Sequence, residues 1–419
     1  MKQLTWLLWA VPLLLSGTTN AADASTSSTA AASKKVPSSS DFSAAQISSG
    51  DALTYLSQLA KNNSDSVAAS AASAKMRRGV CSPANVRIRR EWRTLSKNDR
   101  KAYINAVKCL RTKPSLLAPG VAPGSVSLYD DFVAIHLMQT LTIHLTATFL
   151  TWHRYFTWTY EEHLRNDCGY TGTVPYWEWG LDVNNPAASP VFDGSDTSLG
   201  GNGQFFSHPG MILTEPFNAT ALIPLPPGTG GGCVQTGPFA NFTEHIGPVA
   251  VAKYGTTDTD SVPDPLNDHP RCLKRDLNAG IAKRFTSFYN TTTLILQNND
   301  VEHFQALMQA DPRYIHGELG VHGGGHFTIG GDPGSDPFIS PGDPAFFLHH
   351  SQIDRVYWIW QMLDFPNRKT IFGTGTFLNV PPSANVQLTD TIDITPLAPV
   401  VKVGDLLSTF AGPFCYIYV

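Results

Sequence analysis

Several kinds of residue pattern are absent from this chain of 419 residues. Only 15% of the residues are Asp, Glu, Lys or Arg, and the formal net charge is −4. No basic cluster is interleaved with aromatic residues, which argues against nucleic acid as a partner. No stretch approaches the ~20 apolar residues of a membrane-spanning helix, so no membrane partner is expected. No two cysteines have C-x-x-C spacing, which argues against a cysteine zinc site.

The first 22 residues have the pattern of an export signal. Lys2 precedes an apolar run from Leu4 to Leu15, and small residues follow around Ala21 and Ala22. A charged start, a short apolar middle and a small-residue end are typical of a secretory signal peptide. The sequence therefore predicts a signal peptide over residues 1–22 and a secreted, extracellular protein.

Export gives a meaning to two further features. Four N-x-S/T sequons become candidate N-glycan sites, at Asn62, Asn218, Asn241 and Asn290. The six cysteines become candidate disulfide partners: Cys81, Cys109, Cys168, Cys233, Cys272 and Cys415. Six cysteines allow about 15 pairings, and the sequence does not choose among them.

An Ala/Ser-rich tract occupies residues 23–78. Such a composition has little to bury and predicts a disordered linker or propeptide, with room for a short helix near Asp51–Leu59. The tract ends in Arg77-Arg78. This dibasic pair is either a processing site, with cleavage after Arg78, or a chance cluster of surface charge. The folded domain is expected to span residues 79–419.

The rest of the chain predicts a mainly α fold with long loops and a few short strands. Apolar residues recur at helical spacing over 87–108, where Ser96 or Asn98 could cap a second segment. Helices are also predicted over 130–139 and 300–310. Residues 181–268 are dense in Gly, Pro, Asn and Asp and predict long loops. Residues 381–399 predict extended chain.

A histidine cluster stands between Val321 and Gln361. His322 and His326 are four residues apart, which places both side chains on one face of a helix. The doublet His349-His350 follows the next loop, with Asp354 four residues beyond it. Three imidazoles from two segments predict a metal site, and Asp354 is the candidate carboxylate that orients a ligand. A zincin site is excluded, because Gly323 stands where H-E-x-x-H needs Glu.

A second histidine set consists of His136, His144 and His153. Nine residues on one straight helix rotate a side chain about half a turn out of phase. Therefore either the chain bends after His144 or only one of His144 and His153 is a ligand. The run of threonines from 140 to 151 is weak in helix propensity and favours the bend, with a new helix over 154–165.

The remaining motifs have structural interpretations. The block V-P-Y-W-E-W-G at 174–180 is expected to pack under the helices. His208, His245 and His269 lie in the predicted loops and are interpreted as surface histidines rather than ligands.

Two histidine triplets, the second ending in D-P-x-F-F-L-H-H-x-x-x-D-R, resemble the type-3 copper family of tyrosinases, catechol oxidases and haemocyanins. The resemblance covers roughly residues 79–419 and includes P-Y-W-E-W, where Glu178 replaces the family's Asp. The terminal Y-I-Y at 416–418 resembles the tyrosine motif that closes the catalytic domain. By this likeness the chain is of the short secreted fungal kind, without the C-terminal domain of longer members.

The resemblance implies a central four-helix bundle that holds two copper ions. His136, His144 and His153 would bind copper A, and His322, His326 and His350 would bind copper B. His350 rather than His349 is chosen because the family's ligand lies four residues before the Asp. Neutral imidazoles also suit copper better than carboxylates do. The implied reaction is oxidation of o-diphenols to o-quinones, with O2 reduced to water.

Departures from the family pattern predict the subclass. Members that hydroxylate monophenols well often carry Asn directly after the first copper-B histidine, where it helps a Glu to activate a water. Here that position is Gly323, and Glu318 is either the matching Glu or a solvated loop acid. Monophenol hydroxylation is therefore expected to be weak or absent. Thr142 replaces the cysteine that forms a thioether with the second copper-A histidine. Phe327 and Phe338 are expected to line the pocket, and Phe338 or Pro337 to overhang the copper.

Three rival functions remain at this point. The protein could be a true tyrosinase with substantial monophenol activity. The same six histidines could serve a haemocyanin-like oxygen carrier without turnover. A mononuclear zinc hydrolase could use the second cluster alone.

Overall fold

The computed structural model describes residues 36–73, 81 and 85–419, with no side-chain description for 69–73. The predicted signal peptide at 1–22 and the dibasic pair Arg77-Arg78 lie outside the described residues. No helix in the described part is both long enough and apolar enough to cross a membrane.

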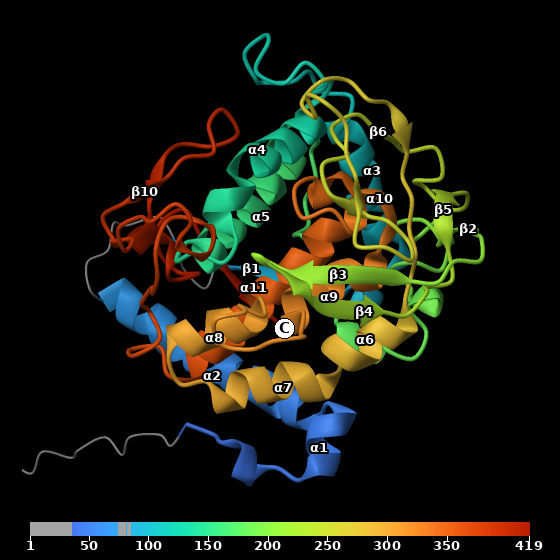
Figure 1. Cartoon of the computed structure of the whole chain (residues 1–419). Helices are drawn as coiled ribbons and strands as arrows, with labels where there is room; N and C mark the ends of the chain where they lie inside the picture. The colour runs from blue at the N-terminus through green and yellow to red at the C-terminus, as the bar shows by residue number, and fades with distance from the viewer. Residues whose placement is uncertain (1–35, 74–80, 82–84) are drawn as a thin grey trace, which may run out of the picture. The chain divides into compact units, whose positions relative to one another are not determined.

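The described chain is mainly helical, with short strands (Figure 1). Its α-helices are α1 (Ala44–Ser49), α2 (Asp51–Ser73), α3 (Lys97–Leu110), α4 (Leu128–Ile143), α5 (Phe149–Asn166), α6 (Ala279–Phe285), α7 (Phe288–Gln297), α8 (Val301–Met308), α9 (Gly320–Ile329), α10 (Gly331–Gly334) and α11 (Ala345–Leu363). This agrees with the predicted mainly α class.

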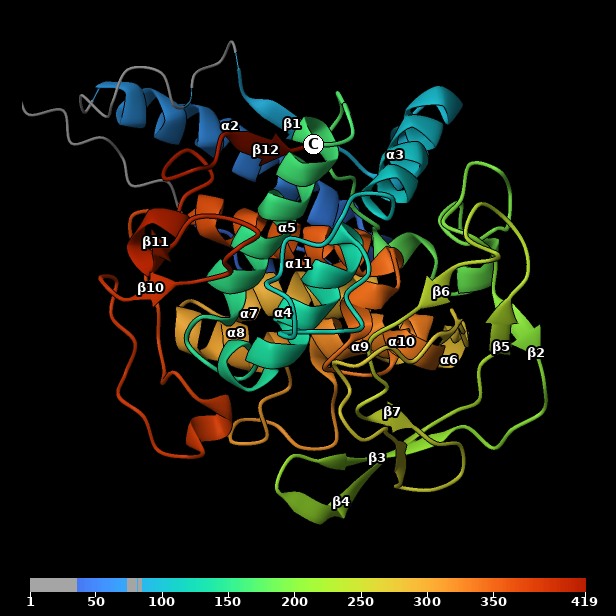
Figure 2. The same cartoon turned by 90° about the horizontal axis from the view of Figure 1, so that it is seen from above.

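The strands pair two by two and build no large sheet in the described chain. β1 (Arg87–Arg89) pairs in parallel with β12 (Tyr416–Tyr418). The antiparallel pairs are β2 (Gly203–Phe205) with β5 (Gly231–Val234), β3 (Met211–Glu215) with β4 (Asn218–Leu225), β6 (Thr243–Glu244) with β9 (Arg271–Cys272), β7 (Val251–Ala252) with β8 (Thr259–Asp260), and β10 (Thr391–Ile392) with β11 (Val401–Lys402). The β3–β4 hairpin projects from the helical part (Figure 2).

Helix α11 forms the middle of the core. Every residue from Ala345 to Leu363 is buried, as expected for a helix that is enclosed on all sides. Helices α2, α5, α7 and α9 all contact it. Its polar side chains must therefore find partners inside the protein. Arg355, for example, forms a buried ion pair of 2.7 Å with Glu178 of the predicted aromatic block.

Asp354 is the most heavily bonded of these polar residues. Its Oδ1 accepts a hydrogen bond from Nε of Arg154 at 2.6 Å. Its Oδ2 accepts from the hydroxyls of Tyr416 at 2.6 Å and Tyr418 at 2.7 Å, and from Nη1 of Arg89 at 3.4 Å. One carboxylate thus joins α11, α5, β1 and the C-terminal strand β12.

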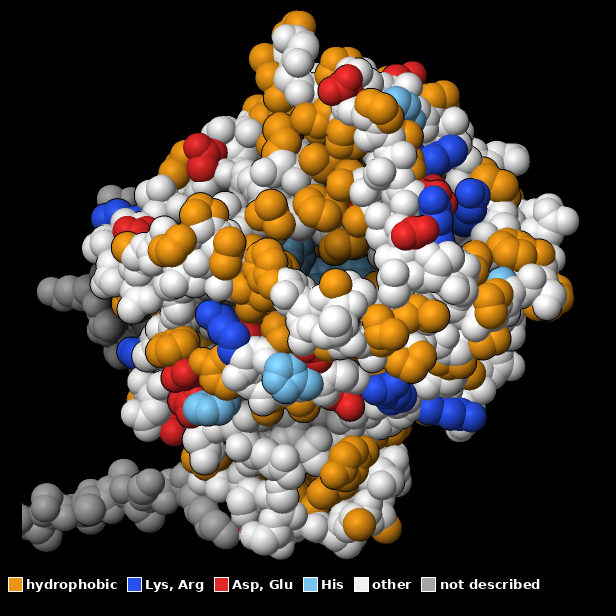
Figure 3. Space-filling view, in the orientation of Figure 1, with side chains coloured by type: hydrophobic (Ala, Val, Ile, Leu, Met, Phe, Trp, Pro, Cys, Tyr) orange, Lys and Arg blue, Asp and Glu red, His pale blue; other side chains and the backbone are white. Residues whose placement is uncertain are grey.

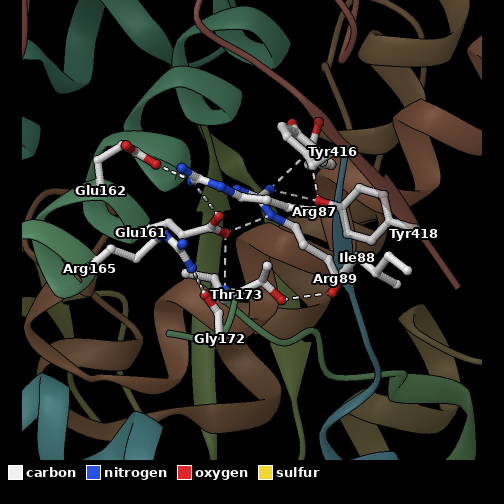
Figure 4. Close-up of polar contacts among 12 residues, drawn as sticks. Arg87, Ile88, Arg89, Glu161, Glu162, Arg165, Gly172, Thr173, Tyr416 and Tyr418 are labelled. Carbon is white, nitrogen blue, oxygen red and sulfur yellow. Dashed lines mark hydrogen bonds and ion pairs between the residues drawn. The ribbon is translucent and has the colours of Figure 1, made fainter. Parts of the chain in front are cut away.

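Residues of the β1–β12 pair and of α5 extend this hydrogen-bond network (Figure 4). Arg89 also donates to Oε2 of Glu161 on α5 at 3.0 Å, and Arg87 bonds Glu161 and Glu162. The disulfide Cys81–Cys415 lies beside the same strands, since Cys415 directly precedes β12. The terminal tyrosine motif therefore closes the structure through buried hydroxyls.

All six cysteines are paired, in the pattern Cys81–Cys415, Cys109–Cys168 and Cys233–Cys272. No cysteine of the chain is free. Each disulfide joins segments distant in the sequence, so no local pattern could have selected this pairing.

Two sequence predictions are wrong. The Ala/Ser-rich tract is not a disordered linker throughout, because residues 44–73 form α1 and α2. Helix α2 buries Leu53, Leu56 and Ala60, at helical spacing, in the core around α11. The helix predicted over 87–108 begins only at Lys97, capped by Ser96, because residues 87–89 pair with β12 instead.

We predict that Asp354→Asn lowers the free energy of unfolding by about 3–5 kcal/mol, because it leaves buried Arg154 without its counter-charge, whereas Arg89 keeps Glu161. Urea denaturation measures the change. Asp390→Asn, at an exposed carboxylate, is the matched control and should stay within about 0.5 kcal/mol of the parent protein. Equal effects of the two substitutions would contradict the role given to Asp354.

The pH dependence gives a second measure. Burial opposes the charge of Asp354, but Arg154, Arg89 and the two tyrosines outweigh it and hold its pKa below the ordinary value. A depressed pKa in the folded state stabilises the protein above about pH 4, the ordinary range of an unfolded Asp. This stabilisation is lost as the pH falls through the folded-state pKa. The Asn variant should lack this component of acid sensitivity.

Candidate metal centre

The first histidine set is built by two helices and the bend between them. His136 lies within α4, and α4 ends at His144, which has an extended backbone. Leu145 then takes a left-handed conformation with φ of 49°. α5 begins at Phe149 and places His153 about one turn into the helix. The predicted bend after His144 is confirmed, although the new helix starts five residues before the predicted Arg154.

A backbone carbonyl orients each of these imidazoles. Nδ1 of His136 lies 2.8 Å from the carbonyl oxygen of Phe338, Nδ1 of His144 lies 3.0 Å from that of Thr140, and Nδ1 of His153 lies 2.9 Å from that of Phe149. A carbonyl can only accept, so Nδ1 carries the hydrogen and the Nε2 lone pair is free. The Nε2 atoms of His136 and His153 are buried and have no hydrogen-bond partner among the described residues.

The second histidine set comes from α9 and α11. His322 and His326 lie one turn apart on α9, and their Nε2 atoms are 3.2 Å apart. Nε2 of His350 lies 3.1 Å from Nε2 of His326. Three ring nitrogens therefore converge on one point from two helices.

His349 belongs to the same neighbourhood but points differently. It is fully buried, and its ring lies 5.3 Å from that of Trp179 and 4.5 Å from that of His326. His350 instead stacks on His153 of the first set, with ring centroids 4.5 Å apart. His350 thus faces the space between the two sets, and His349 packs behind the second set.

The two sets share one site. Besides the His153–His350 stack, the ring centroids of His144 and His322 are 5.7 Å apart. The ligand atoms of His136, His144 and His153 lie within 4.8 Å of one another, and so do ring nitrogens of His322, His326, His349 and His350. Six imidazoles from helices α4, α5, α9 and α11 and the bend after α4 therefore surround a common centre.

Burial keeps these imidazoles neutral. It lowers the pKa of His144 to about 4 and that of His349 to about 3, and it depresses the pKa of the other five well below the ordinary value. A neutral imidazole with a free Nε2 is the form that binds a transition metal. Such burial without a partner is costly, and a metal ion would satisfy the unpartnered nitrogens.

The glycine run of α9 permits the close packing of this site. A Cβ at Gly325 would lie 2.1 Å from Cε1 of His349, and one at Gly324 would lie 2.4 Å from Cβ of Phe285. A Cβ at Gly323 would meet only the side chain of Leu319, at 3.2 Å. Of the three glycines, Gly324 and Gly325 are therefore closely packed, and Gly323 lines the cavity.

A cavity of about 380 Å³ opens over the two histidine sets. Figure 3 shows imidazoles at the bottom of a hollow whose rim is mainly hydrophobic. Glu318, Gly323, Phe327 and Phe338 all line the cavity, as the sequence predicted for the two phenylalanines. Glu318 is partly exposed and lies 3.8 Å from Nη2 of Arg284.

Asp354 does not line the cavity. Its hydrogen-bond partners are two arginines and two tyrosines, and none is a histidine. The prediction that it orients an imidazole directly is therefore wrong. Asp354 instead positions the helix that carries His350.

In the described part of the chain, neither histidine set includes His208, His245 or His269, as the sequence predicted. His208, however, is not a surface residue. Its side chain is only 3% exposed and lies 3.3 Å from Asp276, and its ring packs on Tyr254.

Comparison with known proteins identifies the family. Residues 126–363 match the family model described as "Common central domain of tyrosinase". The chain is 40% identical to Tyrosinase P of Aspergillus terreus over 335 residues, which cover 79% of this chain and 91% of the relative. The chain belongs to the tyrosinase family.

Two further similarities extend this tyrosinase assignment. The chain is 34% identical to the N-acetyl-6-hydroxytryptophan oxidase ivoB of Emericella nidulans over 355 residues, covering 81% of this chain and 93% of the relative. A solved mutant of the polyphenol oxidase from Thermothelomyces thermophila superposes with a TM-score of 0.81 at 42% identity. That match covers 88% of this chain and 98% of the solved chain. The homologues support a copper-type oxidoreductase.

The family implies a type-3 dicopper centre, and the donor set fits it. Imidazole nitrogens suit copper, and the two histidine clusters offer no competing carboxylate among the residues described. The unpartnered, buried Nε2 atoms of His136 and His153 are the structural sign of this fit. Sequence reasoning missed the carbonyls of Thr140 and Phe149, although both lie four residues before a histidine and could have been inferred from a helix. It also missed the carbonyl of Phe338, for which no local signal exists.

We predict that Gly325→Ala displaces His349 and lowers both the melting temperature and the copper content, because overpacking a core of this kind costs about 1–3 kcal/mol. Gly323→Ala is the matched control on the same helix. It requires only a small shift of Leu319, and alanine favours a helix over glycine by about 0.5–1 kcal/mol. Calorimetry and metal analysis of the two variants test the difference. A destabilising Gly323→Ala with a neutral Gly325→Ala would refute it.

Proposed function

We propose that this protein oxidises o-diphenols to o-quinones with O2 as the electron acceptor, and that monophenol hydroxylation is weak or absent. Two catechols are oxidised for each O2 reduced to two waters. The observation that carries this proposal is the meeting of two histidine triplets with inward-facing nitrogens under one phenol-sized cavity.

The histidines would hold two copper ions in a four-helix bundle of α4, α5, α9 and α11. His136, His144 and His153 would hold copper A, and His322, His326 and His350 would hold copper B. The bound pair would supply two-electron redox chemistry with O2. The protein would contribute position, neutrality of the ligands and a sheltered cavity.

The chain's own residues define how a phenol reaches this centre. Phe327 and Phe338 present apolar surface to an aromatic ring in the cavity. Phe338 also accepts the hydrogen bond of His136 through its carbonyl, so its backbone is fixed relative to that ligand. These two side chains would restrict the orientation of the substrate's aromatic ring in the cavity.

The residues beside His322 favour diphenols. Gly323 has no side chain with which to hold a water beside Glu318. The carboxylate of Glu318 forms an ion pair with Arg284 and is partly exposed. Both features make it a weaker base for removing the proton of a phenol hydroxyl. A catechol already carries both hydroxyls and needs no ring hydroxylation, so its oxidation depends less on such a base.

Copper quantification together with oxygen uptake tests this proposal. We expect two coppers per chain, and oxygen consumption with catechol that is at least about tenfold faster than with the matched monophenol. One zinc per chain and no oxygen uptake would establish the hydrolase rival. Reversible oxygen binding without loss of catechol would establish the oxygen carrier.

We predict that Gly323→Asn raises the ratio of monophenol to diphenol turnover by up to about tenfold, because the amide can hold a water against Glu318. Gly323→Ala is the control for bulk at this position and should leave the ratio unchanged. Adding Glu318→Gln to Gly323→Asn should remove the gain. If the gain persists in the double variant, Glu318 is not the base.

The secreted location, the N-glycans at Asn62, Asn218, Asn241 and Asn290 and cleavage after Arg78 belong to the same proposal. They are supported by the sequence patterns of the export signal and the sequons. Mass spectrometry of the purified protein, before and after glycosidase treatment, tests all three.

A further inference from the structure

The outer rim of the cavity brings together two distant aromatic residues. Phe217 stands in the turn between β3 and β4, and Phe377 lies in the segment between α11 and β10. Their ring centroids are 5.9 Å apart, in an edge-on arrangement. Phe377 and Pro216, the neighbour of Phe217, both line the cavity. The pair therefore stands at the edge of the space above the histidines.

Phe217 is costly to the protein in two ways. It is 70% exposed, which leaves a large apolar surface in water. It also has a φ of 60°, a left-handed conformation that aromatic residues rarely adopt. Nothing in the packing of the described residues compensates for this exposure. Strain of this kind in an exposed apolar residue points to a role in binding.

The same strain recurs around the cavity. Leu145 and Ala310, which line it, have φ values of 49° and 50°, and Leu378 and Asn379, which follow Phe377, have 50° and 61°. The amide of Leu378 donates to the carbonyl of Leu145 at 3.3 Å, and the amide of Leu145 donates to the side-chain oxygen of Gln309 at 2.7 Å. These bonds hold the Phe377 segment against the bend that carries His144.

The charges that line the cavity are all acidic, and no Lys or Arg of the described chain lines it. Glu215 accepts from the backbone of Gly317 and pairs with His316, and Asp336 accepts from three backbone amides. Both carboxylates are therefore already occupied. Glu318 is paired at 3.8 Å with Arg284, which lies outside the cavity lining, so Asp258 is the carboxylate that would most repel a carboxylate on a substrate.

Resting on the proposed oxidase function, we propose that Phe217 and Phe377 bind the ring substituent of the catechol and make the site selective for uncharged, apolar substituents. The hydroxyls would face the histidines at the bottom of the cavity, and the substituent opposite them would pack against the apolar surface that the paired phenylalanines form at the rim. Both residues would act on substrate specificity through the substituent, because they lie at the rim of the cavity and not beside the histidines.

A panel of catechols on the copper-loaded protein is the first test. We expect kcat/KM to be about tenfold higher for 4-tert-butylcatechol than for unsubstituted catechol, because a hydrophobic contact of this size discriminates by at least that factor. We expect 3-(3,4-dihydroxyphenyl)propionate, which carries a carboxylate, to fall below unsubstituted catechol. Oxidation of unsubstituted catechol is the reference, and its absence would refute the oxidase function itself. Turnover of all three catechols at equal kcat/KM would refute the selectivity alone.

Phe217→Ala and Phe377→Ala locate the selectivity. Each should reduce the preference for 4-tert-butylcatechol over unsubstituted catechol by about fivefold or more, mainly by raising the KM for 4-tert-butylcatechol. Phe205→Ala is the matched control, since Phe205 is 66% exposed on β2 and does not line the cavity. A preference that survives both rim substitutions, or that falls equally in Phe205→Ala, would overturn the proposal.

A binding measurement separates recognition from turnover. The probe is 4-hexylresorcinol, whose hydroxyls are not adjacent and cannot give an o-quinone. Its dissociation constant, measured by calorimetry on the copper-loaded protein, should rise about fivefold or more in Phe217→Ala and stay unchanged in Phe205→Ala. Unchanged affinity in Phe217→Ala would place the substituent elsewhere.

Discussion

The buried carboxylate of Asp354 is the interaction on which the rest of this structure depends. Two arginines and two tyrosines surround it, so a single charge links α11 to α5, β1 and β12. Arg154 directly follows His153 on α5, and Asp354 follows His350 by one turn on α11. The ion pair therefore fixes the two helices in the register that stacks His153 on His350. Removing one partner would leave a buried charge without compensation, which is why the network acts as a unit.

The histidines themselves are held by the backbone rather than by acids. Three carbonyls accept from Nδ1 of the first set, and the close approach of Gly325 to His349 confines the second. Carbonyls orient an imidazole without adding charge, so burial can keep each ring neutral. A carboxylate among the ligands would instead favour a harder ion. This arrangement of neutral donors is compatible with the copper centre that the tyrosinase family implies.

The sequence revealed what is local and concealed what is distant. The six histidines, the bend after His144 and helix α8 follow from spacings and propensities within a few residues. The aromatic block at 174–180 was expected under the helices, and Trp179 does pack against His349. The acceptor for His136 lies 202 residues away, and the partner strand of β1 lies near the other end of the chain. The short helix expected near Asp51–Leu59 is the first part of α2, but the full length of α2 was missed because its buried residues, such as Leu53, Leu56 and Ala60, are separated by many alanines and serines.

Chemistry and selectivity are carried by different parts of the molecule. The histidines at the bottom of the cavity are carried by helices, and the buried ion pairs of these helices restrict which substitutions the fold tolerates. Part of the cavity wall is formed by the β3–β4 hairpin and by the segment around Phe377, which lie outside the long helices. Loops on a rigid scaffold tolerate substitution, and they can alter which phenol enters without disturbing the histidines. Phe217 has its left-handed conformation in the two-residue turn of this hairpin, directly after Pro216, and this turn holds its ring at the rim of the cavity.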